Sequence, residues 1–91
     1  MIRSFRDKEL EKFWLSHGEI HVKNVPSDLR RVTYRKLREI NRAYSSQDLR
    51  NVPDNHFEKL RGWKHADYYS IRINIQYRLI FFFDKIIKPM K

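Results

Sequence analysis

The 91-residue sequence contains no cysteine, two glycines and three prolines. Without cysteine the chain can form neither a disulfide nor a thiolate zinc site, which fits a reducing compartment. Glycine at only positions 18 and 62 excludes a glycine-rich phosphate loop, and with it nucleotide-driven phosphoryl transfer. The longest purely apolar run, 79–83, is far shorter than the ~18 residues of a membrane span, and the N-terminus lacks a signal-peptide core. We therefore expect a soluble, cytoplasmic protein with no membrane partner.

Acidic residues are scarce as well. The 11 Asp and Glu residues stand against 20 Lys and Arg residues, which leaves a formal net charge of +9. A surplus of this size indicates a polyanionic partner, above all RNA or the ribosome. The length suits a single domain, 1–91, with one hydrophobic core.

Two helices are expected in the first half of the chain. After a short opening strand, helical spacing of apolar residues predicts a helix from Asp7 to about His17-Gly18. A second helix is predicted over about 28–45, with Ser27 as its N-cap and an apolar stripe that reaches Tyr44. Its other face is basic.

The second half of the chain predicts strands, in the overall order β-α-α-β-β-β. One strand is expected at 56–61, and a hairpin at 67–83 extends a small, mainly antiparallel sheet that the helices cover, giving an α+β fold. Beyond it only Ile86 and Ile87 could form a stub, because Pro89 blocks further pairing. We therefore expect a truncated final strand that leaves 79–83 as an exposed apolar edge.

The hairpin carries an unusual pair of like charges. Period-2 alternation puts its apolar residues on one face and Arg72 and Arg78 on the other. A three-residue loop, 74–76, keeps apolar residues opposite apolar ones and sets the two arginines opposite each other. Such a pair costs roughly 0.2–1 kcal/mol relative to a neutral pair, so folding alone gives no reason to select it. An anion bound between the arginines would supply that reason.

These segments resemble a known family. "F-E-K-L-R-G" at 57–62 and "Y-Y-S-I-R-I-N-I-Q-Y-R-L-I-F-F-F" at 68–83 are similar to the HigB branch of the RelE/ParE toxin superfamily, and the opening "MIRSFRDKELEKFW" extends the likeness. The resemblance implies a toxin of a type II toxin–antitoxin system. Such toxins are ribosome-dependent mRNA endoribonucleases that inhibit translation. Their partner in this branch is a helix-turn-helix, HigA-like antitoxin.

Cleavage of RNA without a metal needs cations on the phosphate oxygens and a base near the 2′-hydroxyl. Arg72 and Arg78 are predicted to hold the scissile phosphate through their planar guanidinium groups. Arg61 occupies the place of a family lysine and is the third candidate. A structural alternative pairs Arg78 or Arg61 with a carboxylate, Glu58 or Asp67.

The general base is harder to assign. The resemblance suggests a histidine-bearing tail in relatives, whereas "DKIIKPMK" contains no histidine. His56 is therefore our candidate base, with Glu58 as the alternative. No cofactor is expected; "HGEIH" at 17–21 is too weak a pattern to predict a metal site.

Further residues are predicted to bind RNA. On the second helix we expect a basic face that follows a phosphate backbone, unless it is simply solvated. Near the proposed site, cationic residues could contact phosphates and one tyrosine could stack on a base. The predicted RNA contacts are Arg35, Lys36, Arg38, Lys59, Lys64, His65 and Tyr68. Two alternatives remain at this point: a non-catalytic RNA- or ribosome-binding module, and an inactive truncated toxin relative that mainly binds its antitoxin.

Overall fold

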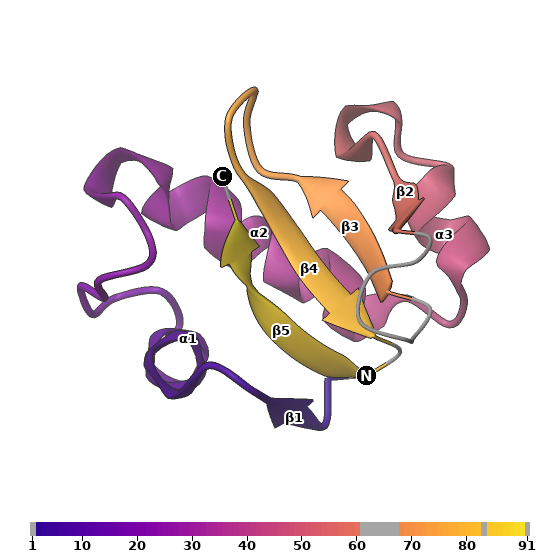
Figure 1. Cartoon of the computed structure of the whole chain (residues 1–91). Coiled ribbons are helices and arrows are strands. Elements are labelled where there is room, and N and C mark those ends of the chain that lie inside the picture. Colours follow the sequence, from indigo (N-terminus) through magenta and orange to yellow (C-terminus); the bar gives the residue numbers. More distant parts are fainter. Residues whose placement is uncertain (1, 61–67, 83, 91) are drawn as a thin grey trace.

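The computed structural model describes residues 2–60, 68–82 and 84–90. Its architecture is α+β, as predicted: helices cover one face of a five-stranded mixed sheet in the order β1-β5-β4-β3-β2 (Figure 1). The strands are β1 (Ser4–Phe5), β2 (Glu58–Leu60), β3 (Tyr68–Arg72), β4 (Arg78–Phe82) and β5 (Lys85–Met90). The helices are α1 (Lys8–Leu15), α2 (Arg30–Arg42) and the short α3 (Ser46–Arg50), with 3-10 turns at Ser27–Leu29 and Pro53–Asn55.

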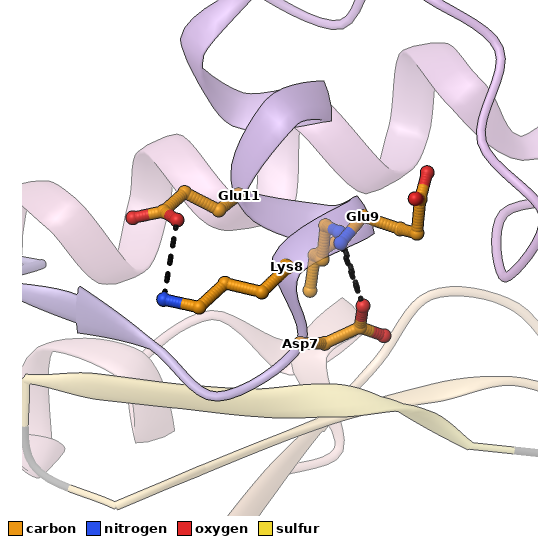
Figure 2. Close-up of polar contacts among 5 residues, drawn as sticks. Asp7, Lys8, Glu9 and Glu11 are labelled. Carbon is orange, nitrogen blue, oxygen red and sulfur yellow. Dashed lines mark hydrogen bonds and ion pairs between the residues drawn. The ribbon is translucent and has the colours of Figure 1, made fainter.

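Helix α1 begins where its sequence predicts and ends at Leu15, two residues before the predicted His17. Asp7 is the N-cap, and its Oδ1 accepts the backbone N–H of Glu9 at 3.0 Å (Figure 2). An ion pair of 3.7 Å between Lys8 and Glu11 spans the first turn. After the helix, the chain reverses through left-handed residues that include Gly18, where a Cβ atom would lie only 3.0 Å from the Cβ of Tyr34.

Helix α2 is shorter than the predicted 28–45. Ser27–Leu29 forms a 3-10 turn, and Ser27 makes no capping hydrogen bond, so the predicted N-cap is wrong. At the other end Ala43 is extended, with φ −67° and ψ 135°, and this ends the helix at Arg42. Tyr44 is consequently fully exposed instead of continuing the apolar stripe.

The hairpin has the predicted register. Arg72 lies opposite Arg78, and the N–H of Ile73 donates to the carbonyl of Tyr77 at 2.9 Å, which closes the three-residue loop. Asn74 supports the loop through its side chain, whose Oδ1 accepts the N–H of Tyr77 at 2.7 Å. Apolar alternation was therefore sufficient to place the two arginines opposite each other.

The expectation of a truncated final strand that leaves β4 as an edge is wrong. Strand β5 pairs with β4 along its length, including Leu79 opposite Pro89, and its start pairs in parallel with β1. Pro89 is tolerated because β1 pairs only with Lys85 and Ile86, so among the described residues no strand lies beside Pro89 on the far side of β5 to receive an N–H. The N-terminal and C-terminal strands thus complete one side of the sheet.

The core lies between the helices and one face of the sheet. Leu10, Phe13, Leu37 and Ile40 from α1 and α2 form one buried cluster with Ile71, Leu79, Phe81 and Ile86. The alternate residues of β3 and β4 point to the other face, which we call the outer face of the sheet. In the described ranges, no helix combines the length and apolar character needed to cross a membrane.

Candidate functional site

The outer face of the sheet carries successive cross-strand pairs along β3 and β4. Arg72 lies opposite Arg78, and Ser70 lies opposite Ile80. Residues two apart on a strand share a face, so both pairs belong to the outer face. The two arginine side chains therefore start side by side on the face away from the helices.

Arg78 is held in place by two neutral acceptors. Its Nε donates to the Oγ of Ser70 at 2.8 Å, and its Nη2 donates to the carbonyl oxygen of His56. Ser70 is fully buried, so its hydroxyl is a fixed anchor for the guanidinium. Ser70 was not among the site residues predicted from the sequence, although its place on the same face as Arg72 was a usable signal.

Arg72 contacts the same histidine. Its Nη1 lies 3.2 Å from the Nε2 of His56. A guanidinium can only donate hydrogen bonds, so this contact requires Nε2 to be the acceptor. We refer to His56, Ser70, Arg72 and Arg78 together as the arginine–histidine cluster.

His56 does not lie in a strand, as the sequence analysis expected. It follows the 3-10 turn Pro53–Asn55 and has φ 43° and ψ 52°, in the left-handed region, and β2 begins only at Glu58. For a residue with a side chain this conformation costs about 1–2 kcal/mol. The left-handed turn brings both the ring and the carbonyl oxygen of His56 within reach of the two arginines.

No carboxylate neutralises the cluster within the described residues. Glu58 lies opposite Ser70, yet it forms no ion pair with Arg72 or Arg78 there. The alternative in which Glu58 pairs with Arg78 is therefore not observed, and Asp67 lies outside the described residues. Two guanidiniums held by uncharged acceptors are suited to bind an anion through charge-assisted hydrogen bonds.

Lys36 is not on the exposed basic face where the sequence analysis put it. It is only 3% exposed, and its Nζ donates to the Oδ1 of Asn55 at 2.6 Å and pairs with Glu39 at 3.5 Å. The spacing held a signal for this, because Lys36 follows Thr33 by three residues and precedes Ile40 by four, and both are buried. The ammonium group of Lys36 therefore makes its hydrogen bond inside the protein and is not exposed on the helix surface.

The exposed basic face of α2 consists of other residues. Spacing of four, three and four residues aligns exposed arginines on the side of the helix opposite its buried residues. None of them has an ion-pair partner in the part of the chain that the structure describes. We call Arg31, Arg35, Arg38 and Arg42 the arginine stripe. It points away from the sheet, and the arginine–histidine cluster lies on the sheet's other face.

Two other predicted RNA-binding residues lie on different faces of the sheet. Tyr68 shares the outer face with Ser70 and Arg72, and its ring centre lies 5.5 Å from that of Phe82. Lys59 pairs with Tyr69 and therefore belongs to the helix-covered side of the sheet at its edge strand.

The predicted site residues Arg61, Lys64 and His65 lie outside the described residues. Within 2–60, 68–82 and 84–90, no group of three or more His, Cys, Asp or Glu side chains could hold a metal ion. The weak metal pattern at 17–21 thus does not assemble into a ligand set, and His21 instead contacts the hydroxyl of Ser27 at 2.9 Å.

Fold and geometry together define a small, basic α+β protein with helices on one sheet face and an arginine–histidine cluster on the other. A family model for the RelE-like toxin HigB of type II toxin–antitoxin systems matches residues 3–88. Toxin HigB-1 of Vibrio cholerae is 40% identical over 81 residues, which cover 89% of this chain and 82% of that toxin. An uncharacterised protein of Haemophilus influenzae is 46% identical over 77 residues, or 85% and 73% of the two chains.

The chain belongs to the HigB-like family of RelE-type toxins. Membership implies a cognate antitoxin as partner, because type II systems pair a protein toxin with a protein antitoxin. The expected family resemblance and α+β fold are both confirmed.

Proposed function

We propose that this toxin is a ribosome-dependent mRNA endoribonuclease that inhibits translation in the cytoplasm, with residues 1–91 acting as one domain. The observation that carries the proposal is the placement of Arg72 and Arg78 opposite each other, both in contact with His56. Like charges in that arrangement oppose folding unless an anion joins them. A phosphate of messenger RNA is an anion of the right shape for two guanidinium forks.

In the proposed reaction the ribose 2′-oxygen attacks the adjacent phosphorus, and the bond from phosphorus to the 5′-oxygen breaks. Arg72 turns from His56 to the phosphate, which frees Nε2 to accept the proton of the 2′-hydroxyl. The products are a 2′,3′-cyclic phosphate and a 5′-hydroxyl, which takes its proton from water. Arg72 and Arg78 stabilise the negative charge that grows on the non-bridging oxygens.

Residues around the cluster complete the proposed RNA site. Tyr68 stacks on a base next to the scissile phosphate, because it shares the outer face with Arg72. Arg35 and Arg38, within the arginine stripe, contact phosphates elsewhere on the ribosome. Arg61 remains a predicted third cation at the phosphate, and Lys59, Lys64 and His65 remain predicted RNA contacts.

The cognate partner is proposed to be a helix-turn-helix, HigA-like antitoxin. Its expected effect is to suppress cleavage when the two proteins are present together. Family membership supports an antitoxin partner, and the net charge of +9 favours an acidic surface on it.

The test is cleavage of a defined message on purified ribosomes. The wild-type protein is expected to cut ribosome-bound message and to leave the same RNA intact without ribosomes. An Arg72→Ala, Arg78→Ala double variant should still associate with ribosomes through its other cations but should not cut. If the folded wild type binds ribosomes and cuts nothing, the enzyme assignment fails and the non-catalytic binding module is the correct interpretation.

A further inference from the structure

A buried polar connection runs from α2 to the turn that carries His56. Lys36 is 3% exposed, and its Nζ donates to the Oδ1 of Asn55 at 2.6 Å. Glu39 contacts the same ammonium at 3.5 Å, but its side chain is 27% exposed. The Lys36–Asn55 hydrogen bond is therefore the buried part of this connection.

Asn55 uses both ends of its side-chain amide. Its Oδ1 accepts from Lys36, and its Nδ2 donates to the carbonyl oxygen of Leu49 at 3.0 Å. The side chain of Asn55 is fully buried, and the backbone N–H of Asn55 donates to the carbonyl oxygen of Val52 at 3.0 Å. Asn55 thus joins α2, α3 and the 3-10 turn, and the next residue in the chain is His56.

His56 depends on that anchor more than an ordinary loop residue would. Its left-handed backbone is unfavourable for a residue with a side chain, so neighbouring contacts must hold it in place. Both arginines of the cluster donate hydrogen bonds to this one residue. Arg72 donates to its ring nitrogen, and Arg78 donates to its carbonyl oxygen. A small rotation of the turn would displace both acceptors at once.

We propose that Lys36 and Asn55 are positioning residues for the cleavage site: their buried hydrogen bond holds His56 in the left-handed conformation that orients Arg72 and Arg78. The proposal rests on the proposed function for its consequence in catalysis. Its structural part, the coupling between Lys36 and the cluster, stands without it. Lys36 acts from inside the protein and has no direct role in RNA binding.

The variant that tests this is Lys36→Met, which keeps an unbranched side chain as far as Cε and removes the ammonium donor. On ribosomes, kcat is expected to fall ten- to a hundredfold, the order of loss that follows from misplaced reacting groups. KM and the salt dependence of ribosome association should stay within twofold of the wild type, because the charge removed is a buried one. Lys36→Arg should restore part of kcat.

The matched control is Glu39→Gln, which removes the partly exposed ion-pair partner and leaves the Lys36–Asn55 bond in place. Its kcat is expected to stay within twofold of the wild type. Both proteins are assayed at a temperature at which circular dichroism shows them folded, so a fall in kcat reflects the folded molecule. If Lys36→Met does not fold, the shorter Lys36→Leu, which also lacks a donor, replaces it.

A readout without RNA separates this proposal from the proposed function. The ¹⁵N shift of His56 Nε2 in the free protein reports its contact with Arg72, and the Nε–H of Arg78 reports the separate bond to Ser70. In Lys36→Met the His56 signal should move towards that of an unbonded imidazole, while the Arg78 signal should change much less.

The possible results separate the positioning role of Lys36 from the proposed function. An unchanged His56 signal in folded Lys36→Met overturns the proposal whatever the cleavage result. A raised KM with a flatter salt dependence also overturns it, because that result assigns Lys36 to RNA contact. If the His56 signal moves but the wild type cuts no message, the positioning role stands and the proposed function fails.

Discussion

Arg78 contacts two other members of the arginine–histidine cluster, Ser70 and His56. It faces a like charge across the hairpin, yet it is tied to a buried serine hydroxyl and to a backbone carbonyl. Such an arrangement lowers the stability of the fold somewhat and leaves positive charge in a position where it can bind an anion. The same residue is therefore expected to matter more to activity than to folding.

The first prediction is that Arg78→Ala abolishes cleavage with a small change in stability. Removal of one charge-stabilising group should lower kcat on the order of a hundred- to a thousandfold. The free energy of unfolding should fall by only about 1 kcal/mol, since removal of the hydrogen bonds is partly offset by relief of the repulsion with Arg72. Ribosome cleavage assays and urea unfolding measure the two quantities.

The control for that variant is Ser70→Ala, which removes one anchor of Arg78 but keeps the guanidinium. It should reduce cleavage less than Arg78→Ala. If a folded Arg78→Ala protein cleaves message at the wild-type rate, Arg78 is not part of the catalytic site.

The second prediction separates the ring of His56 from its backbone. His56→Gly and His56→Asn both remove the imidazole, and both residues tolerate the left-handed conformation. If the imidazole is the general base, each variant should lose about a hundred- to ten-thousandfold in kcat. Stability should be unchanged or higher in His56→Gly, by up to about 1 kcal/mol, because glycine lowers the cost of that backbone. Near-normal cleavage by His56→Asn would show that the ring is not the base.

At the scale of elements, β5 changes the expected behaviour of the sheet. It covers the edge of β4 and brings β1 into the sheet, so the apolar strand β4 is paired on both sides. Solubility of the free toxin therefore does not require another protein to cover that edge.

The third prediction is slow hydrogen exchange in β4 and at Ile86 in the dilute, free protein. Amides there should exchange at least on the order of a hundredfold more slowly than that of Ile75 in the exposed hairpin loop, because breaking two ladders requires a larger opening. Mass spectrometry or NMR under native conditions measures this. Exchange in β4 as fast as in the loop would contradict the pairing of β5.

Helix α2 divides its basic residues between two environments. Lys36 is buried, whereas the arginine stripe is exposed and has no acidic partner among the described residues. Only the exposed set can contribute counterion release when RNA binds.

The fourth prediction concerns salt dependence. Replacing Arg31, Arg35 and Arg38 by glutamine should flatten the plot of log affinity for ribosomes against log salt by about 0.7–0.9 for each phosphate that the toxin no longer neutralises. The rate of cleavage at saturating ribosome concentration should not change, because the stripe is remote from the cluster. A control with three charges removed elsewhere, at Lys8, Lys12 and Lys23, should keep the wild-type slope. Equal slopes for all three proteins would mean that the stripe is only solvated.

At the scale of the whole molecule, basic groups lie on both sides of the sheet. The arginine stripe points away from one face and the arginine–histidine cluster occupies the other. A single extended RNA strand cannot easily reach both, whereas a ribosome that surrounds the protein can. Dependence on the ribosome is thus in keeping with the shape of the charge distribution.

The fifth prediction is made for cells. Expression without the antitoxin should slow growth and protein synthesis, and co-expression of the cognate antitoxin should restore both. Growth curves and incorporation of a labelled amino acid measure the effect, with Arg78→Ala as the inactive control. A wild-type protein that accumulates in folded form without slowing growth would contradict the proposed function.

The sequence alone determined the features that depend on neighbours in the chain. Period-2 alternation was enough for the hairpin register and for Arg72 opposite Arg78, and the quoted motifs were enough for the family. Helix α1 was likewise predicted from its own apolar spacing.

The tertiary structure decided whatever depends on contacts between distant segments. From the sequence, Lys36 was predicted to be one more exposed cation. In the folded protein its ammonium group is buried, because Asn55, 19 residues along the chain, supplies an acceptor. His56 was predicted to lie in a strand. In the folded protein the buried Asn55 and both arginines hold it in a left-handed turn. Strand β5 pairs with β4 along its length, and β1, from the other end of the chain, pairs with its start. Local patterns carry no information about such partners, since pairing energies between remote segments appear only when the chain is folded.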